Sequence, residues 1–278
     1  MVDAHVHVFP PEMVKARDAY LSRDARFGEI YASPAARMAT ADDLLRAMDE
    51  NQVEASVLAG FPFADEGLCR LVNDYVLEQV RLHPGKLAGL ACVAPGRAGA
   101  ADALTRCLDA GLRGAGELAP PNWSALEAVR TGTDGLDAIA ECLRERGLPL
   151  LMHASEPVGH AYAGKGRFLP EDCLALAMAY PGLKIVLAHM GGGLFLFETM
   201  PEVRTALADV FYDTAAVPYL YCPEIYDVAI SSAGVRKIIF GTDYPLLSPE
   251  RYLAGLGRLA PDLRRAIEDG NAREAYGL

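Results

Sequence analysis

The chain has 278 residues, of which 51% are hydrophobic and 23% are charged, a composition that supports a large core and argues against bulk disorder. Its 26 Lys and Arg residues stand against 37 Asp and Glu, which gives a formal net charge of -11. Because phosphate backbones are bound by basic surfaces, this acidity argues against nucleic acid as a partner.

Short apolar or β-branched runs recur along the chain and predict strands. Most of them are spaced to hold one strand and one crossover helix. The eight runs are 2–8, 54–59, 87–93, 112–118, 148–153, 184–189, 210–214 and 237–243.

Helical patterns lie between these runs. One of them begins at Thr40, whose hydroxyl can cap the helix while Asp43 reaches back to it, and Leu44, Leu45 and Met48 then form an apolar stripe. Several other helical stretches are followed by Gly or Pro, residues that end helices. These stretches are 67–83, 98–110, 135–146, 171–180 and 223–233.

Eight strand–helix units in a chain of this length predict an α/β fold, a closed (β/α)8 TIM barrel, with a single domain over residues 1–278. The connection between the first two strands is oversized, so we expect residues 9–52 to form a small insertion over the barrel mouth. In this fold the functional groups come from the carboxyl ends of the strands.

The N-terminus and the cysteines bear on where the protein works. No basic segment precedes an apolar run at the N-terminus, and no apolar run is long enough to span a bilayer, so we expect neither a secretory signal nor a membrane partner. The six cysteines are scattered and form no CxxC pair. We therefore expect free thiols and a cytoplasmic location.

Histidines and one aspartate fall at the ends of the predicted strands. His5 and His7 are two residues apart on the first strand, and side chains at that spacing point to the same face. His153 ends the fifth strand, His189 the sixth and Asp243 the eighth. Imidazoles and a carboxylate that converge at a barrel mouth are the donors of a metal site.

Each of these residues alone has an ordinary structural explanation. A single histidine at a strand end is usually a hydrogen-bonded polar residue, and Asp243 could cap a helix before Tyr244-Pro245. The joint pattern favours the metal site, because structural histidines have no reason to recur at the ends of the first, fifth and sixth strands.

Five segments carry a resemblance to a known family. They are Asp3-Ala-His5-Val-His7, Met152-His153-Ala, Leu187-Ala-His189-Met-Gly191-Gly192, Phe240-Gly-Thr-Asp243-Tyr-Pro245 and the closing residues 270–278. In this order the sequence resembles, over its whole length, the amidohydrolase superfamily, specifically the amidohydrolase-related TIM barrels that include aminocarboxymuconate semialdehyde decarboxylase-like enzymes. The resemblance implies that His5, His7, His153 and Asp243 bind a divalent metal, commonly zinc, and that His189 is a ligand or polarises the substrate.

Glu117 ends the predicted fourth strand and has two interpretations. In two-metal members of the superfamily an acid or modified lysine on this strand bridges the metals, and the TatD-like nucleases carry a similar Gly-Glu-Ile. Glu117 then bridges two ions, with His189 holding the second. Alternatively it contacts substrate or is structurally paired. The Leu-Ala-Pro that follows Glu117 and the acidic net charge depart from the nuclease pattern and put DNA hydrolysis in doubt.

The segment after the fifth strand is rich in Gly and polar residues and lies at the functional end of a barrel. We predict that His160, Tyr162 and Lys165 recognise substrate there, with Lys165 as a point cation for a carboxylate or phosphate, although a solvated loop is the alternative. Tyr244 and Trp123 are further candidates for the mouth. The run 191–193 is three glycines, which either open a helix toward an anion or form a tight turn.

Three functions are compatible with these residues. The first is a metal-dependent hydrolase that cleaves an amide, lactone or ester, with Asp243 moving the proton of a metal-activated water and His189 polarising the carbonyl. The second is a decarboxylase, a lyase in which Asp243 or His189 protonates carbon as carbon dioxide leaves. The third is an inactive barrel that binds a ligand.

The cofactor and partners follow from the same residues. We expect one or two divalent ions, zinc first, while manganese, iron and cobalt also suit such donors. The expected partner is a small-molecule substrate, with a homodimer as an open alternative.

Overall fold

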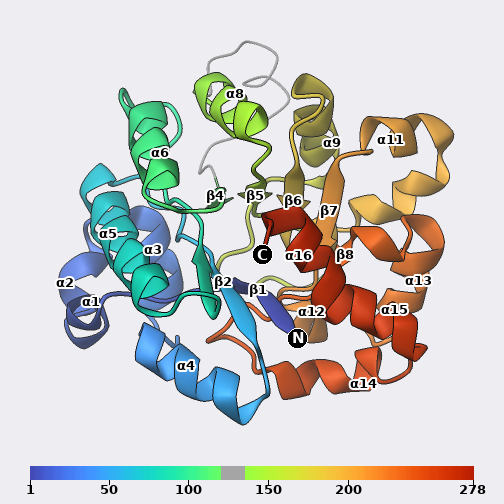
Figure 1. The fold of residues 1–278 in the computed structure, drawn as a ribbon, viewed down its shortest axis with the longest axis horizontal. Coiled ribbons are helices and arrows are strands. Elements are labelled where there is room, and N and C mark those ends of the chain that lie inside the picture. The colour runs from blue at the N-terminus through green and yellow to red at the C-terminus, as the bar shows by residue number, and fades with distance from the viewer. Residues whose placement is uncertain (120–134) are drawn as a thin grey trace.

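Parallel strands surrounded by helices form the core of the computed structural model, which describes residues 1–119 and 135–278 (Figure 1). Each strand lies inside one of the predicted runs. The strands are β1 Val2–Val6, β2 Ala55–Leu58, β3 Leu87–Gly89, β4 Ala115–Leu118, β5 Leu150–Met152, β6 Ile185–Leu187, β7 Val210–Asp213 and β8 Ile238–Ile239. They pair in parallel in the orders β1-β2-β3 and β4-β5-β6-β7-β8.

Hydrogen bonds join these two sheets into a closed barrel. A parallel bridge between Ala91 and Ala115 links the end of β3 to β4, and another between Val6 and Tyr244 links β1 to the segment after β8. The Ala4 amide also donates to the Phe240 carbonyl at 2.9 Å. The predicted (β/α)8 barrel is therefore confirmed.

Helices fill the connections, and the stretches predicted as helical correspond to α4, α5, α6, α8, α9 and α13. The helices of the described residues are α1 Pro11–Lys15, α2 Asp18–Leu21, α3 Ala25–Tyr31, α4 Ala41–Glu50, α5 Glu66–Leu82, α6 Ala100–Asp109, α8 Asp137–Arg146, α9 Pro170–Ala179, α10 Ala188–Gly191, α11 Pro201–Ala206, α12 Val217–Leu220, α13 Ile225–Ser232, α14 Leu253–Leu256, α15 Pro261–Arg265 and α16 Asn271–Tyr276, with short turns η1 Leu194–Thr199, η2 Val235–Lys237, η3 Pro249–Tyr252 and η4 Ala266–Gly270. None of the helices in these described ranges has the length and apolarity needed to cross a membrane.

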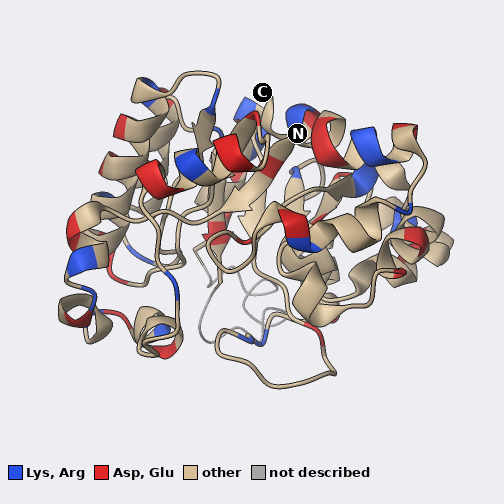
Figure 2. Ribbon diagram, turned by 90° about the horizontal axis from the view of Figure 1, so that it is seen from below, with Lys and Arg blue, Asp and Glu red and all other residues tan. Residues whose placement is uncertain are grey.

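Small and branched side chains fill the barrel interior, and the last helix closes one end of it. Val2, Val57 and Val186 are among the buried residues of this interior cluster, and Ala272 and Tyr276 of α16 belong to it as well. Both termini lie at this end (Figures 1 and 2), and the outer helices carry many of the Lys, Arg, Asp and Glu residues (Figure 2). The opposite end, where the strands finish, is left for the functional groups.

Residues 9–52 contain α1 to α4, and α3 lies at the barrel mouth. The Asp24 carboxylate caps α3 by accepting from the amides of Arg26 and Phe27, and it also accepts from the Ala64 amide of the segment after β2. Aromatic rings fix the helix from the other side, where Tyr31 packs within ring-to-ring distances of 4.7–5.6 Å. The rings around it are Phe9, Phe27 and Phe61.

The predicted capping box of α4 is present and gives a test of the sequence reasoning. Thr40 Oγ1 accepts from the Asp43 amide, and Asp43 accepts from the Thr40 amide at 2.9 Å. We expect Thr40→Ala to lower the free energy of unfolding by about 1 kcal/mol in urea denaturation. Thr40→Ser keeps the hydroxyl and is expected to match the wild type, so equal stability of all three proteins would contradict the role of the cap.

Candidate metal centre

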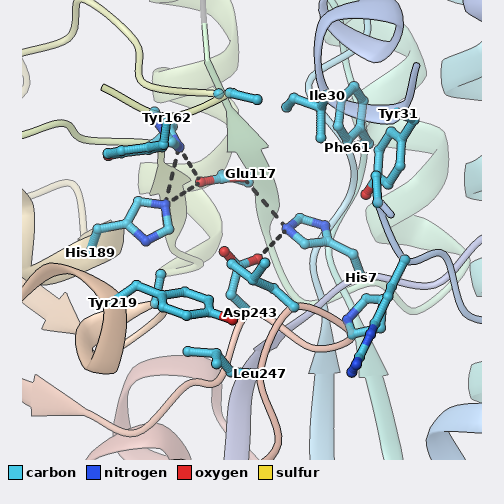
Figure 3. A pocket seen from close by; sticks show the side chains of 18 of the residues that line it. His7, Ile30, Tyr31, Phe61, Glu117, Tyr162, His189, Tyr219, Asp243 and Leu247 are labelled. Atoms are coloured by element: carbon cyan, nitrogen blue, oxygen red, sulfur yellow. Dashed lines mark hydrogen bonds and ion pairs between the residues drawn. The ribbon is translucent and has the colours of Figure 1, made fainter. Parts of the chain in front are cut away.

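All six predicted metal ligands meet at the carboxyl ends of the strands. The donor atoms form two sets of three, and within each set the three atoms lie within 4.8 Å of one another. Glu117 belongs to both sets. One set adds His5 and His7 to Glu117, and the other adds His153 and His189. Figure 3 shows Glu117 between His7 on one side and His189 on the other.

Glu117 joins the two groups through its two oxygens. Its Oε2 lies 3.7 Å from His7 Nε2, whereas its Oε1 lies 2.9 Å from His153 Nδ1 and 3.6 Å from His189 Nε2. Asp243 belongs to neither set of three, but its Oδ1 lies 3.4 Å from His7 Nε2. The centre is therefore a continuous cluster with a carboxylate in the middle and another at one side.

The ends of the strands place these side chains by leaving regular structure. The runs predicted to finish at His153, His189 and Asp243 stop earlier, because β5, β6 and β8 end at Met152, Leu187 and Ile239. His189 and Asp243 adopt positive φ angles of 56° and 61°. Residues other than glycine are strained in this left-handed backbone conformation, and such strain is concentrated at functional sites.

The imidazoles are oriented by acceptors behind them. His5 Nδ1 donates to Asp213 Oδ2 at 2.7 Å, and His7 Nδ1 donates to the Ala59 carbonyl at 3.2 Å. Because neither acceptor can donate, both Nδ1 atoms carry the proton, and in the neutral rings both Nε2 lone pairs face the same point, 3.2 Å apart. His189 Nδ1 is held in the same way by the Ala215 carbonyl at 2.9 Å.

The carboxylates of the cluster favour positive charge next to them. Burial opposes a charged ring on His5 and His189, but the nearby carboxylates outweigh it and raise the pKa of His5 to about 10 and that of His189 to about 9. Burial also opposes ionisation of the acids, yet the facing imidazoles bring the pKa of Asp243 to about 2 and hold the pKa of Glu117 well below its usual value. By contrast, burial lowers the pKa of His153.

These observations fit a divalent cation. Convergent imidazole lone pairs with carboxylates between them are a preformed donor set for zinc, manganese or a similar ion. The Nδ1 atoms of His5, His7 and His189 already face outer acceptors, which is how metal-binding histidines are usually oriented, whereas His153 turns Nδ1 toward Glu117 and Nε2 toward Ser155. The residues that could hold an ion are the six of the predicted set: His5, His7, Glu117, His153, His189 and Asp243.

Sequence reasoning missed Asp213, which supports both sides of the cluster. This fully buried carboxylate ends β7 and accepts from His5 through Oδ2. Its Oδ1 accepts from the backbone amides of His189 and Ala215, each at 3.0 Å. No motif marks Asp213, and the one available signal was an acid at the end of the seventh predicted strand.

We expect Asp213→Asn to weaken metal binding by about 10–100-fold in chelator competition. Both carboxylate oxygens of Asp213 accept hydrogen bonds from N–H groups. In either orientation of an asparagine side chain, its NH2 group would therefore face one of these N–H donors and could not bond to it. Asp209→Asn, in the exposed turn just before the same strand, is the matched control and is expected to bind metal as the wild type does. If the Asp213→Asn protein bound metal as tightly as the wild type, Asp213 would have no role in supporting the metal site.

The cluster opens into a cavity of about 790 Å³, and two of the four predicted substrate residues line it. His160 and Tyr162 line the cavity, and Tyr162 donates to Glu156 at 2.8 Å. Lys165 and Tyr244 are not among the residues that line it, so their contact with substrate stays a prediction. Trp123 lies outside the described residues.

The two exceptions have local causes. The Lys165 ammonium donates to the carbonyls of Val158 and His160, so its own loop uses the charge that was predicted for substrate. The Tyr244 backbone extends the barrel by accepting from the His7 amide at 2.7 Å, and its side chain packs against the core cluster on the side of α4.

The three glycines after β6 form a tight turn rather than the opening of a long helix. Gly191, Gly192 and Gly193 all have positive φ, and a Cβ on Gly192 would lie 2.3 Å from the Ser155 carbonyl oxygen. Only glycine allows this close approach between the segments after β5 and β6. The turn thereby supports the placement of His153 and His189.

Residues 9–52 supply cavity residues that sequence reasoning missed. Arg26, Ile30 and Tyr31 come from α3 and line the cavity, and Phe61 of the segment after β2 adjoins them (Figure 3). The Tyr31 ring is buried among aromatic neighbours, while its hydroxyl faces the cavity (Figure 3). Nothing in the sequence around these residues distinguishes them from an ordinary amphipathic helix.

A sequence model of one family, described as amidohydrolase, matches residues 2–278. The chain belongs to this amidohydrolase family. No curated protein sequence matches it. As an amidohydrolase-family chain with this cluster of histidines and acids, the protein is assigned to the enzymes of that superfamily.

Solved structures share the fold over the whole chain. The 5-carboxyvanillate decarboxylase of Sphingomonas paucimobilis is 20% identical, with coverage of 100% of this chain and 99% of that one and a TM-score of 0.76. The dihydroxybenzoic acid decarboxylase of Polaromonas sp. JS666, which holds manganese and the inhibitor 2-nitroresorcinol, is also 20% identical, covers 100% and 96%, and has a TM-score of 0.71.

A third structure is a candidate 2-pyrone-4,6-dicarboxylic acid hydrolase from Pseudomonas putida. It is 18% identical, with coverage of 99% of this chain and 97% of that one and a TM-score of 0.69. At these identities the three structures establish the shared fold of the amidohydrolase-family chain, while the reaction has to be argued from its site.

Proposed function

We propose that this protein is a metal-dependent decarboxylase that acts on a small, unsaturated or aromatic carboxylic acid. The observation that carries the proposal is the surface beside the cluster. There Leu247 lies next to Asp243, and Ile30 and Phe61 lie together on another side of the cavity (Figure 3). Apolar surfaces of this kind suit a flat ring, and a carboxylate in the same cavity suits proton transfer.

The relatives support this choice over hydrolysis. Two of the three structures described above are decarboxylases of aromatic acids, and both resemble this chain from end to end. A divalent ion, when bound, would supply a Lewis acid that holds and polarises the carboxylate oxygens of the substrate. The manganese of the Polaromonas relative makes manganese the first ion to test, ahead of the zinc expected from sequence.

Asp243 is the proposed proton donor. Its side chain is 18% exposed, the most of any member of the cluster, and it lines the cavity. His189 is 7% exposed, and both of its ring nitrogens already face protein acceptors or the cluster. Because its pKa is about 2, Asp243 is ionised at neutral pH and first takes a proton from solvent in the cavity. As the carbon–carbon bond to the carboxylate breaks, the electron pair stays on the substrate carbon and takes that proton from Asp243, so carbon dioxide leaves, a C–H bond remains and Asp243 is ionised again.

The remaining expectations about organisation are part of this proposal. We propose one domain over residues 1–278 in which residues 9–52 cover the mouth, since α3 of that segment lines the cavity. The six cysteines are all free in the structure, which supports a reducing, cytoplasmic setting. A small-molecule substrate is the expected partner.

The proposal is tested by measuring carbon dioxide released from hydroxylated aromatic acids by manganese-loaded and zinc-loaded protein. The same preparations are assayed on lactones and amides. Carbon dioxide release with no hydrolysis supports the decarboxylase. Hydrolysis of a lactone or amide without carbon dioxide release contradicts it.

Hydrolysis is the second candidate because of one specific observation. Glu117 is shared by two sets of donors, the arrangement that places two ions side by side for attack by water. Elemental analysis separates the candidates further, since two ions per chain favour hydrolysis and one ion favours decarboxylation.

A further inference from the structure

Two cysteines that the proposed reaction does not use lie in contact behind the cavity wall. Cys69 lies near the start of α5, and Cys92 follows β3. Their sulfur atoms are 3.3 Å apart, and both residues are buried, with Cys69 5% exposed and Cys92 1% exposed. A disulfide bond is about 2.0 Å long, so the two sulfur atoms need to approach by little more than about 1 Å to form one.

The backbone around Cys92 is held against α5 by a pair of hydrogen bonds. Asn73 lies one helical turn after Cys69, and its side-chain amide donates to the Cys92 carbonyl at 2.7 Å while its Oδ1 accepts from the Cys92 amide at 2.7 Å. In addition, a Cβ at Gly60 would lie 2.8 Å from the Cys92 Cβ, so glycine is needed at position 60 to leave room for Cys92. The two thiols are therefore kept in contact by a fixed backbone, which favours a reaction between them.

Both thiols also contact the segment after β2, which forms part of the cavity wall. The Cys92 sulfur donates to the Phe61 carbonyl at 2.8 Å, and the Cys69 sulfur donates to the Phe63 carbonyl at 3.6 Å. Phe61 lines the cavity (Figure 3). A disulfide has no S–H proton, so its formation would end both hydrogen bonds and pass the change to this wall.

An isolated buried thiol would be inert, and contact between the two thiols makes the difference here. Burial and the neighbouring Cys69 raise the pKa of Cys92 well above its usual value, which disfavours the reactive thiolate. Contact offsets this loss, because a group held against its partner reacts as if it were at very high concentration. Cys69 is the more exposed of the two, so a small oxidant reaches it first.

We propose that Cys69 and Cys92 form a redox site that hydrogen peroxide closes to a reversible disulfide. The Cys69 sulfur attacks one peroxide oxygen, the O–O bond breaks, and a sulfenic acid forms as one water leaves. The Cys92 sulfur then attacks the sulfenic sulfur, and the hydroxyl group leaves with the Cys92 proton as a second water. Two thiols lose two electrons in total, and peroxide is reduced to two waters. This inference does not depend on the proposed decarboxylation.

Peptide mapping of the oxidised protein tests the inference. The folded protein is treated with hydrogen peroxide, denatured, alkylated without reduction and digested with trypsin, which cuts after Arg70 and Lys86 and so separates the two cysteines. We expect a linked pair of peptides that contains Cys69 and Cys92, is two hydrogens lighter than its parts and disappears after dithiothreitol. Circular dichroism should stay unchanged, and the urea midpoint should rise because the bond restricts the unfolded chain.

Three variants make the result specific. Cys69→Ser and Cys92→Ser are each expected to abolish the linked pair, whereas Cys107→Ser is expected to keep it. Cys107, a buried residue of α6, is the matched control because it lies near enough to both thiols for its charge to act on them. A bond from Cys69 to Cys107, a bond that forms only in unfolded protein, or no bond in folded protein whose exposed Cys222 has been oxidised would overturn the inference.

Discussion

Replacing Glu117 with glutamine is expected to weaken metal binding by more than about 100-fold and to remove turnover. Glutamine keeps the shape of Glu117 but not its charge, and Glu117 is the one carboxylate that both sets of donors share. Loss of an outer hydrogen-bond partner typically costs 10–100-fold in metal affinity, so loss of a central ligand should exceed that range. Metal content is measured by elemental analysis after dialysis, with circular dichroism as the check of folding.

Two further variants make this result specific. Glu156→Gln changes a carboxylate that bonds to Tyr162 outside the cluster, and it is expected to retain metal. His153→Ala removes a donor from one set only, so a protein that binds two ions is expected to lose one of them, whereas Glu117→Gln loses both. Wild-type metal content in a folded Glu117→Gln protein would show that Glu117 is a structural or substrate residue.

The barrel and the cluster were predictable from sequence because both depend on local patterns. Strand runs at regular spacing determine which residues finish a strand, and parallel strands bring all such residues to one end of the barrel. His5 and His153 are far apart in the sequence, yet this rule alone places them near each other. The exact strand ends were not predictable, since the positive φ of His189 and Asp243 reflects tertiary constraints rather than propensity.

Asp213 and Arg26 could not be predicted for the opposite reason. The contact between Asp213 and His5 spans 208 positions, and an acid after an apolar run gives no indication of what it faces. Arg26 is held at the cavity by its hydrogen bond to the Gly164 carbonyl, which lies 138 positions away in the sequence. Lys165 shows the same limit, because composition predicts a polar loop but not that its ammonium turns back onto its own backbone.

Asp243→Asn is expected to lower turnover by about 10²–10⁴-fold, the usual contribution of a positioned proton donor. The fold should be intact by circular dichroism, and metal should be retained at saturating concentration because five other donors of the cluster remain. In D₂O the wild type should place deuterium on the carbon that loses carbon dioxide, a label that hydrolysis cannot introduce. Asp227→Asn, exposed on α13, is expected to behave as the wild type. An active Asp243→Asn protein that still labels its product would exclude Asp243 as the donor and leave His189, the second donor predicted from sequence, to be tested in that role.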